Sequence, residues 1–153
     1  MNQKVIAKAN EIVNAKSNFI GGGMDGYVSL ALIDDKGYPV ITTISIAKAD
    51  GINWLTFVPG SERNSVKRAS KCNRACVCIN SRCYHISLVG NIEILTDAES
   101  KIDNWMEPLK EHWDGPEVAD YCVLRFITEH YTIYLIDNDF EGGEIQESGL
   151  LPI

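Results

Sequence analysis

The chain opens with apolar residues at the spacing of an amphipathic helix. Within residues 2–18, hydrophobic side chains recur three and four positions apart, with polar or charged ones between them, which places the hydrophobic ones on one helical face. The residues of this face are Val5, Ile6, Ala9, Ile12 and Val13. The glycine run at 21–23 is expected to end the helix in a flexible connection.

After residue 26 the apolar positions alternate, as they do in β-strands. The segments "GYVSLALI" and "YPVITTISIA" flank a turn at residues 34–37 and predict a hairpin. A second turn at 48–51 leads into "INWLTFV", so the first three strands are expected to form a meander. The other predicted strands are "ACVCIN", "CYHISLVGNIEIL", "YCVLRFI" and "HYTIYLI".

The predicted strand at 83–95 carries a glycine on its apolar face. The apolar side chains of this face are Tyr84, Ile86, Leu88, Ile92 and Ile94. Gly90 occupies the same face, where a side chain would otherwise fill the core. This position predicts a β-bulge or a close approach of another backbone segment.

Two helical stretches interrupt the strands. One is expected at 62–71, and "TDAE" at 96–99 has the pattern of a capping box with Thr96 as N-cap and Glu99 three positions on. The apolar side of this second helix is predicted to consist of Ile102, Trp105, Met106 and Leu109. Pro108 is expected to kink or divide the helix, and Gly115-Pro116 to end the helical region.

These elements predict a mainly β protein of one domain. About seven short strands with alternating faces, joined largely by turns, favour a closed antiparallel barrel with helices over a doubly wound parallel sheet. The sequence contains neither the glycine-rich dinucleotide motif nor a Walker loop. The domain is expected to occupy 1–145, and residues 146–153 form the end of a polar C-terminal tail.

Charge and hydropathy bear on the partners of the protein. The formal net charge is −7, which argues against duplex nucleic acid as the main partner because that binding neutralises phosphates. No stretch reaches the roughly 20 apolar residues of a membrane span, and the N-terminus lacks the apolar core of a signal peptide. We therefore expect a cytoplasmic protein without nucleic-acid or membrane partners.

A basic cluster stands out in this acidic chain. Its members are Arg63, Lys67, Arg68, Lys71 and Arg74. A helix that begins near Glu62 leaves its first N–H groups without intrahelical partners, and these groups together with the helix dipole favour an anion. The cluster therefore predicts a site for a small anion, with a solvated helix whose charges aid solubility as the alternative.

Five cysteines raise the questions of metal and redox chemistry. Four of them, Cys72, Cys76, Cys78 and Cys83, lie within twelve residues, close to His85. Their spacing matches no pattern of paired C-x2-C units, and alternation along a strand places Cys76 and Cys78 on one face. We expect no metal site and interpret the cysteines as small buried thiols in a reducing compartment.

Several segments in order resemble the pyridoxamine 5'-phosphate oxidase-like family, and within it the proteins related to general stress protein 26. The resemblance spans residues 2 to about 145 and rests on "GYVSLALIDDKGYPVITTIS", "INWLTFVPGSERNSVKR", "HISLVGNIEILTD" and the helix that ends in "HWDGP". It implies a split β-barrel of the FMN-binding type that forms a homodimer with FMN between the subunits. The C-terminal substrate motif of the true oxidase is absent, so pyridoxamine phosphate is not the expected substrate.

The resemblance also assigns residues to the cofactor. The phosphate is expected to contact basic and hydroxyl residues after the third strand, and the flavin ring is expected to lie against the second strand and the tryptophans of the helical insertion. The residues implied are Thr42, Thr43, Ile44, Ser45, Val58, Ser61, Arg63, Ser65, Lys67, Trp105 and Trp113. Where many relatives have "S-x-K-V", this chain has Arg63-Asn64-Ser65-Val66, so the positive charge is displaced by two residues.

The sequence leaves several functions open. An FMN-dependent oxidoreductase with an unknown substrate is the first hypothesis, since the flavin itself would carry out the electron transfer. The alternatives are a non-catalytic FMN-binding redox sensor or stress-response module, and metal or haem binding through the cysteines and His85. No catalytic residue is assigned. His85, His112 and His130 are candidates for proton transfer, with His112 favoured because it adjoins Trp113.

Overall fold

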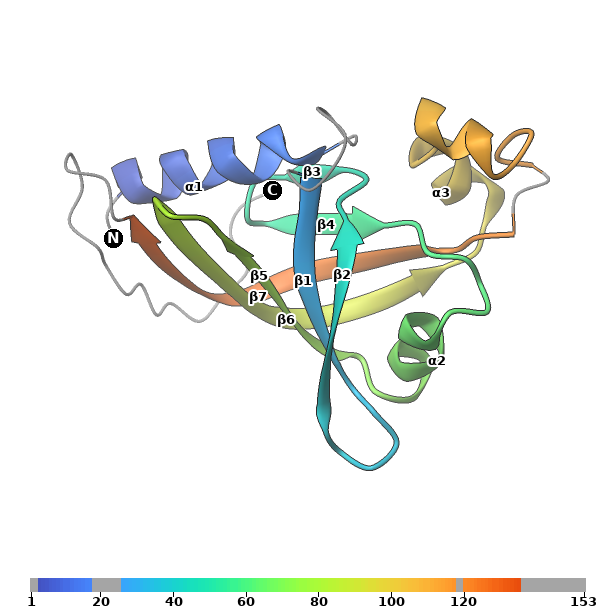
Figure 1. Ribbon diagram of the computed structural model, residues 1–153, viewed down its shortest axis with the longest axis horizontal. Helices are drawn as coiled ribbons and strands as arrows, with labels where there is room; N and C mark the ends of the chain where they lie inside the picture. The colour runs from blue at the N-terminus through green and yellow to red at the C-terminus, as the bar shows by residue number, and fades with distance from the viewer. Residues whose placement is uncertain (1–2, 18–25, 118–119, 136–153) are drawn as a thin grey trace.

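The computed structural model describes residues 3–17, 26–117 and 120–135, which form one curled antiparallel sheet with helices at its sides (Figure 1). The helices are α1 (Gln3–Ala15), α2 (Asn64–Lys71), α3 (Ala98–Asp103) and the 3-10 helix η3 (Glu107–Glu111). The strands are β1 (Tyr27–Ile33), β2 (Pro39–Ser45), β3 (Ala49–Asp50), β4 (Trp54–Phe57), β5 (Arg74–Asn80), β6 (Tyr84–Leu95) and β7 (Val123–Leu135). The glycine run at 21–23 and the predicted tail lie outside the described residues.

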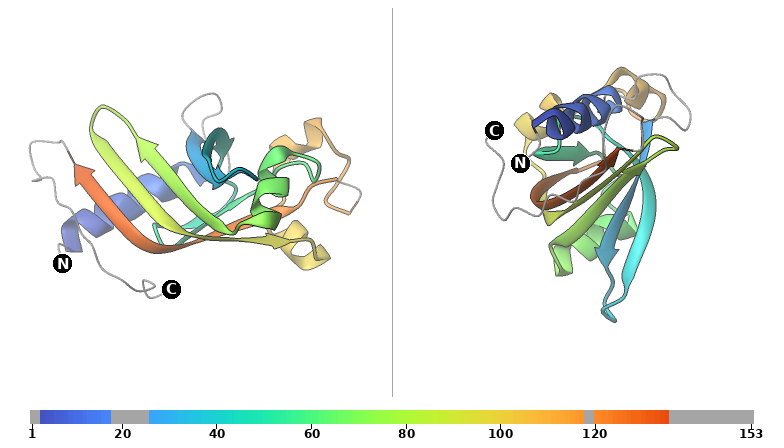
Figure 2. Two further views of the ribbon diagram at one scale, coloured as in Figure 1. Left: turned by 90° about the horizontal axis from the view of Figure 1, so that it is seen from below. Right: turned by 90° about the vertical axis from the view of Figure 1, so that its left-hand side faces the viewer.

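The order of the strands differs from the predicted meander. β1 and β2 form the expected hairpin, but the sheet order is β2-β1-β5-β6-β7-β4-β3. The chain therefore leaves one edge of the sheet after β2 and enters the opposite edge, where β4 pairs with β7. The prediction of a closed barrel is also wrong: β2 and β3 are edge strands, and the sheet curls into a half-barrel, as in a split barrel (Figure 2).

The long strands β6 and β7 give the sheet its curvature. The sequence predicted two strands for the stretch that forms β7, whereas the structure has one continuous strand with a bulge. Val89 pairs with His130 and Gly90 pairs with Thr128, so Glu129 is the extra residue of the bulge. A Cβ on Gly90 would overlap the carbonyl oxygen of Ile127. The predicted bulge and the close backbone approach at Gly90 are both confirmed.

The concave face of the sheet holds the main core, and α1 lies along one side of it (Figure 1). The predicted apolar face of α1 is confirmed, since Val5, Ile6, Ala9 and Val13 are buried and Ile12 packs against the core. Two asparagines of α1 also bind the turn between β3 and β4. Asn14 accepts a hydrogen bond from the Gly51 amide and Asn10 accepts one from the Ile52 amide. Helix and sheet are thus joined by polar as well as apolar contacts.

The middle of the convex face of the sheet carries uncharged side chains. The pairing of β2, β1, β5, β6 and β7 places residues opposite one another in two adjacent rows that run across these strands, and we call them the central rows. They are Thr43–Ser29–Cys78–Ser87–Thr132 and Ile41–Ala31–Cys76–Val89–His130. None of these ten side chains carries a formal charge with histidine neutral, although the chain as a whole has a net charge of −7.

The cysteines are not the buried thiols that the sequence predicted. Cys76 and Cys83 are exposed, Cys72 and Cys78 are half-buried, and all four are free. The reason is strand alternation, which turns Ala75, Val77 and Ile79 of β5 into the core and its two cysteines outward. Burial against neighbouring strands still raises the pKa of the Cys76 and Cys78 thiols. Cys122 is buried, as predicted.

The helical insertion between β6 and β7 is divided, as Pro108 suggested, but its details differ from the prediction. The N-cap of α3 is Asp97, one residue after Thr96, and its carboxylate accepts hydrogen bonds from the Ser100 amide and hydroxyl, which lower the pKa of Asp97. Pro108 lies in the first turn of η3, where its missing N–H is not needed. Ile102, predicted on the apolar side, is exposed.

Candidate functional site

A cavity of about 770 Å³ lies between the sheet edge at β2, the segment after β4, α2 and the helical insertion. Its size falls within the range of about 300–1,000 Å³ that is usual for ligand sites. The residues that line it are Thr42, Thr43, Ile44, Val58, Pro59, Gly60, Arg63, Asn64, Ser65, Arg68, Leu109, His112 and Trp113. Four segments far apart in the sequence therefore form one hollow.

The N-terminus of α2 opens onto this cavity without a side-chain cap. The helix begins at Asn64, two residues later than predicted, and its N-cap is Arg63, whose side chain makes no capping hydrogen bond. The amides of Val66 and Lys67 both donate to the Arg63 carbonyl. Among the described residues, none accepts a hydrogen bond from the amides of Asn64 or Ser65. Two backbone donors at the positive end of a helix dipole thus border the cavity.

Charged and polar side chains strengthen this end of the cavity. Ser65 is only 8% exposed, and its hydroxyl forms no hydrogen bond with another described residue although the residue borders the cavity. Arg63 and Arg68 line the same region, and the first turn of α2 contains no acidic residue. A helix normally favours an acidic side chain at this position. A cation there is favourable when an anion lies beside it.

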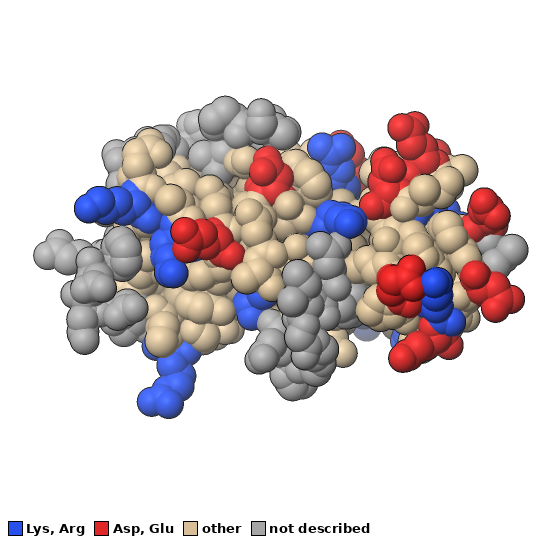
Figure 3. Space-filling model, turned by 90° about the horizontal axis from the view of Figure 1, so that it is seen from above, with Lys and Arg blue, Asp and Glu red and all other residues tan. Residues whose placement is uncertain are grey.

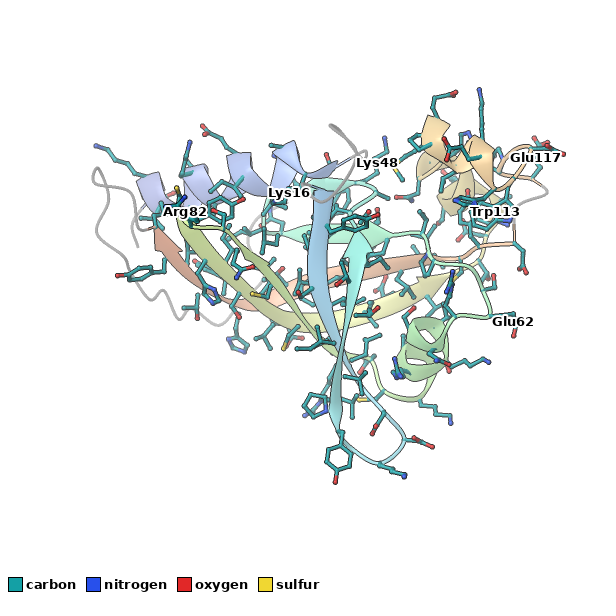
Figure 4. All side chains as sticks on the ribbon, viewed as in Figure 1. Lys16, Lys48, Glu62, Arg82, Trp113 and Glu117 are labelled. Atoms are coloured by element: carbon teal, nitrogen blue, oxygen red, sulfur yellow. The ribbon has the colours of Figure 1, made fainter. Side chains whose placement is uncertain are left out.

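The opposite wall is apolar and aromatic. Val58 and Leu109 are buried, Ile44 is half-buried, and Trp113 presents part of its indole to the cavity. In Figure 4, Trp113 lies on the α2 side of the insertion, above the loop that bears Glu62. The cavity therefore has one cationic end and one flat apolar wall.

An aromatic cluster fixes the position of Trp113. Its ring centroid is 5.4 Å from that of Tyr121, and the ring of Tyr121 is 6.2 Å from that of Trp105. The Tyr121 hydroxyl donates to the Lys101 carbonyl, and burial raises the pKa of this phenol. His112 meets Trp113 edge to face at 5.9 Å between centroids. These contacts hold the tryptophan before any ligand binds.

The cavity brings together most of the residues expected from the sequence. Those that line it are Thr42, Thr43, Ile44, Val58, Arg63, Ser65 and Trp113. Ser45, Ser61, Lys67 and Trp105 do not line it: Trp105 packs behind Trp113 in the smaller core, and Lys67 lines a separate hollow. The assignment of these residues to a cofactor stays a prediction.

Other lining residues were not assigned by the sequence. They are Pro59, Gly60, Asn64, Arg68 and Leu109, and His112, which was named only as a candidate for proton transfer. Arg68 and Asn64 belonged to the basic segment, and the four-residue spacing of Asn64 and Arg68 could have indicated that they share a helical face. The position of Leu109 depends on how the insertion folds back, which no local pattern indicates.

The cavity lining contains no acidic residue among those that the structure describes. Its charged lining residues are Arg63 and Arg68. Figure 3 shows acidic side chains gathered over α3 and η3, on the exposed surface of the insertion. They include Glu99, Asp103, Glu107 and Glu111. The cavity is therefore locally positive although the chain is acidic.

The alternatives based on cysteine find little support in the part of the chain that the structure describes. No three His, Cys, Asp or Glu residues there lie close enough together to hold a metal ion. The raised pKa of the Cys76 and Cys78 thiols disfavours the reactive thiolate form.

None of the described helices has the length and hydrophobicity needed to cross a membrane.

Solved structures place this architecture among known folds. A protein related to general stress protein 26 of B. subtilis, of the pyridoxinephosphate oxidase family, from Clostridium acetobutylicum, superimposes with a TM-score of 0.74 and 25% identity over 90% of this chain and 93% of that one. This chain has the fold of the pyridoxamine 5'-phosphate oxidase-like proteins. The resemblance identified in the sequence is thus confirmed at the level of structure.

Further structures with this fold are more distant in sequence. General stress protein 26 from Bacillus anthracis has a TM-score of 0.65 and 14% identity over 94% of this chain and 98% of that one. An F420 reductase has a TM-score of 0.54 and 16% identity over 69% of this chain and 88% of that one. No protein-family model matches the sequence, and no curated protein matches it.

Proposed function

We propose that this protein binds FMN in the cavity and acts as a flavin-dependent oxidoreductase of the pyridoxamine 5'-phosphate oxidase-like family, with a substrate still to be identified. The observation that carries the proposal is the uncapped N-terminus of α2. Its free amides and the residues Ser65, which is 8% exposed, and Arg63 all border one end of the cavity. This donor set suits a phosphate monoester.

The rest of the cavity suits the remainder of FMN. Trp113, Leu109 and Val58 supply an apolar wall for a flat ring, and Thr42 and Thr43 of the edge strand β2 line the cavity beside it. When bound, FMN supplies hydride and electron transfer. The protein's own residues would bind the phosphate, orient the ring and exclude water from one side of it.

A comparison of FMN with riboflavin tests the binding part of the proposal. The two share the same ring and differ in the phosphate, so the α2 site should favour FMN by about a hundredfold, the size expected for charge-assisted hydrogen bonds. Fluorescence titration of purified protein with each flavin measures the ratio. Equal affinities would show that the α2 end does not hold the phosphate, and no binding of either would remove the proposed function.

The redox part of the proposal has its own measurement. Structural neighbours include an F420 reductase, which supports an enzyme rather than a storage protein. FMN-loaded protein mixed with NADH or NADPH would oxidise the nicotinamide at a rate that saturates with its concentration. A loaded protein that binds FMN tightly but oxidises neither would favour the non-catalytic binding module.

The proposed assembly is a homodimer formed through the convex face of the sheet. The central rows are uncharged, and Tyr27, Ile41, Val89 and Tyr134 on this face are at least 41% exposed. Interface centres are depleted in charge and enriched in such residues. Thr43 belongs both to a central row and to the cavity lining. A second copy on this face would therefore border the cavity and help to enclose the flavin.

A charge on the convex face should dissociate this dimer. We expect Val89→Glu to be monomeric, because a desolvated carboxylate would face the second subunit, and to bind FMN more weakly than the parent protein. Ile102→Glu is the matched control, since Ile102 is an exposed apolar residue of α3 outside this face. Sedimentation analysis measures the mass of each. A monomeric parent protein, or a dimeric Val89→Glu, would contradict the proposed interface.

A further inference from the structure

A second, smaller hollow lies on the other side of α2 from the proposed flavin ring site. It has a volume of about 280 Å³ and separates α2 from the turn between β1 and β2. We call it the basic notch. The residues that line it are Asp34, Asp35, Asn64, Lys67, Arg68 and Lys71.

The basic notch continues from the cavity. Asn64 and Arg68 line both hollows, and Lys71 follows on the same helical face because residues three and four apart are neighbours on a helix. A ligand whose phosphate lies at the N-terminus of α2 thus has a path along Arg68 into the notch. This also accounts for Lys67, which the sequence assigned to the cofactor but which the cavity leaves out.

The charges of the notch indicate which ligand groups could bind there. Lys67, Arg68 and Lys71 supply three cations on one side, which suits a second phosphate. Asp34 and Asp35 face them, and one oxygen of Asp34 already accepts hydrogen bonds from the amides of Lys36 and Tyr38. Between the described residues, no ion pair closes the notch. The helix side therefore keeps its cations available for a ligand.

The two aspartates also indicate which chemical groups the ligand carries at the end that lies beside them. Carboxylates repel a tail that ends in further anions, whereas they accept hydrogen bonds from hydroxyl and amino groups. A ribose and an amino-bearing base provide those donors. The notch thus combines sites for a phosphate and for an uncharged nucleoside.

We propose that the basic notch is a subsite for the second phosphate and the nucleoside of a dinucleotide flavin, so that the site accepts FAD as well as FMN. The first phosphate occupies the N-terminus of α2, the second lies beside Arg68 and Lys71, and the nucleoside reaches Asp34 and Asp35. This inference rests on the proposed flavin function and adds the class of cofactor that the same site accommodates.

Titration of the full-length protein with FMN and with FAD tests the subsite. We expect the parent protein to bind FAD at least as tightly as FMN. Lys71→Glu should weaken FAD binding about tenfold, through loss of one charge-assisted contact and repulsion of the second phosphate, and should change FMN affinity less than about twofold. Arg82→Glu, the corresponding reversal at a distant exposed arginine, should alter neither affinity.

The outcomes separate the two proposals. If FMN binds but FAD binds more than about tenfold more weakly, or if Lys71→Glu weakens both flavins equally, the subsite is wrong and the FMN proposal stands. If the parent protein binds neither flavin, the proposed function fails and the subsite fails with it. A selective loss of FAD in Lys71→Glu supports the subsite.

Discussion

Arg63→Glu is expected to reduce FMN affinity by about a hundredfold or more while leaving the unliganded protein at least as stable as the parent. In the proposed complex the guanidinium of Arg63 would face the phosphate, a charge-assisted interaction worth about 1.5–3 kcal/mol, and the variant would place a carboxylate there instead. Arg63 is exposed and is the N-cap of α2. Titration of protein fluorescence or flavin absorbance with FMN measures the loss.

Arg63→Glu is expected to lower FMN affinity without lowering the stability of the ligand-free protein, and this combination makes the prediction specific. An acidic residue at a helix N-terminus is favourable, so the free energy of unfolding of Arg63→Glu should be unchanged or higher by about 0.3–1 kcal/mol. A variant that bound FMN poorly because it was misfolded would instead be less stable. Urea denaturation of the ligand-free proteins distinguishes the two cases.

Arg82→Glu provides the charge-matched control. Arg82 is exposed in the turn between β5 and β6 and lies at the far end of the molecule from Trp113 (Figure 4). Its reversal changes the net charge by the same amount but does not touch the cavity, so FMN affinity should stay within about twofold of the parent at physiological salt. An equal loss in both variants would mean that net charge, and not the N-terminus of α2, governs flavin binding.

Gly90→Ala is expected to lower the free energy of unfolding by about 2–4 kcal/mol, among the larger effects of a single methyl group. The added Cβ would overlap the carbonyl oxygen of Ile127 and would come within 2.9 Å of its carbonyl carbon and 3.1 Å of the Thr128 Cα. These atoms are backbone of β7 and cannot rotate away. The bulge at Glu129 would have to move, and with it the pairing that curls β6 and β7 together.

Gly115→Ala is the natural comparison. A Cβ at Gly115 would meet no atom within 4 Å, and its φ lies outside the left-handed region. The change should alter stability by no more than about 0.5 kcal/mol, and any gain would come from restriction of the unfolded chain. Thermal and urea unfolding of both variants measure the difference. If Gly90→Ala were as stable as Gly115→Ala, the close approach at the bulge would be wrong.

The features that local sequence predicted well are those with a local physical cause. The helical period of Val5, Ile6, Ala9 and Val13 sufficed for α1, and alternation sufficed for the hairpin and for β6. Gly90 predicted the bulge because a glycine on the buried face of a strand often marks a position where another backbone segment comes close. The basic segment predicted a helix, and α2 forms there with free N–H groups in its own first turn, whereas the anion site stays a prediction.

The predictions from sequence were wrong where a segment can adopt several local structures of similar free energy. Asp97 replaces Thr96 as N-cap because the carboxylate accepts both hydrogen bonds of Ser100, a preference of one position that the motif could not resolve. For the stretch that forms β7 the sequence predicted two strands, with Thr128 and Glu129 between them. The bulge instead accommodates the extra residue and keeps one strand continuous.

Local patterns in the amino-acid sequence account for most of the strands and helices, for the glycine at the bulge and for the basic character of α2. The pairing of β4 with β7 instead of β2, and the cavity between α2, Leu109 and Trp113, depend on how the whole chain folds. Strand partners and facing walls depend on contacts between residues far apart in the chain. Such contacts follow from the packing of the whole sheet and leave no periodic pattern in any one segment.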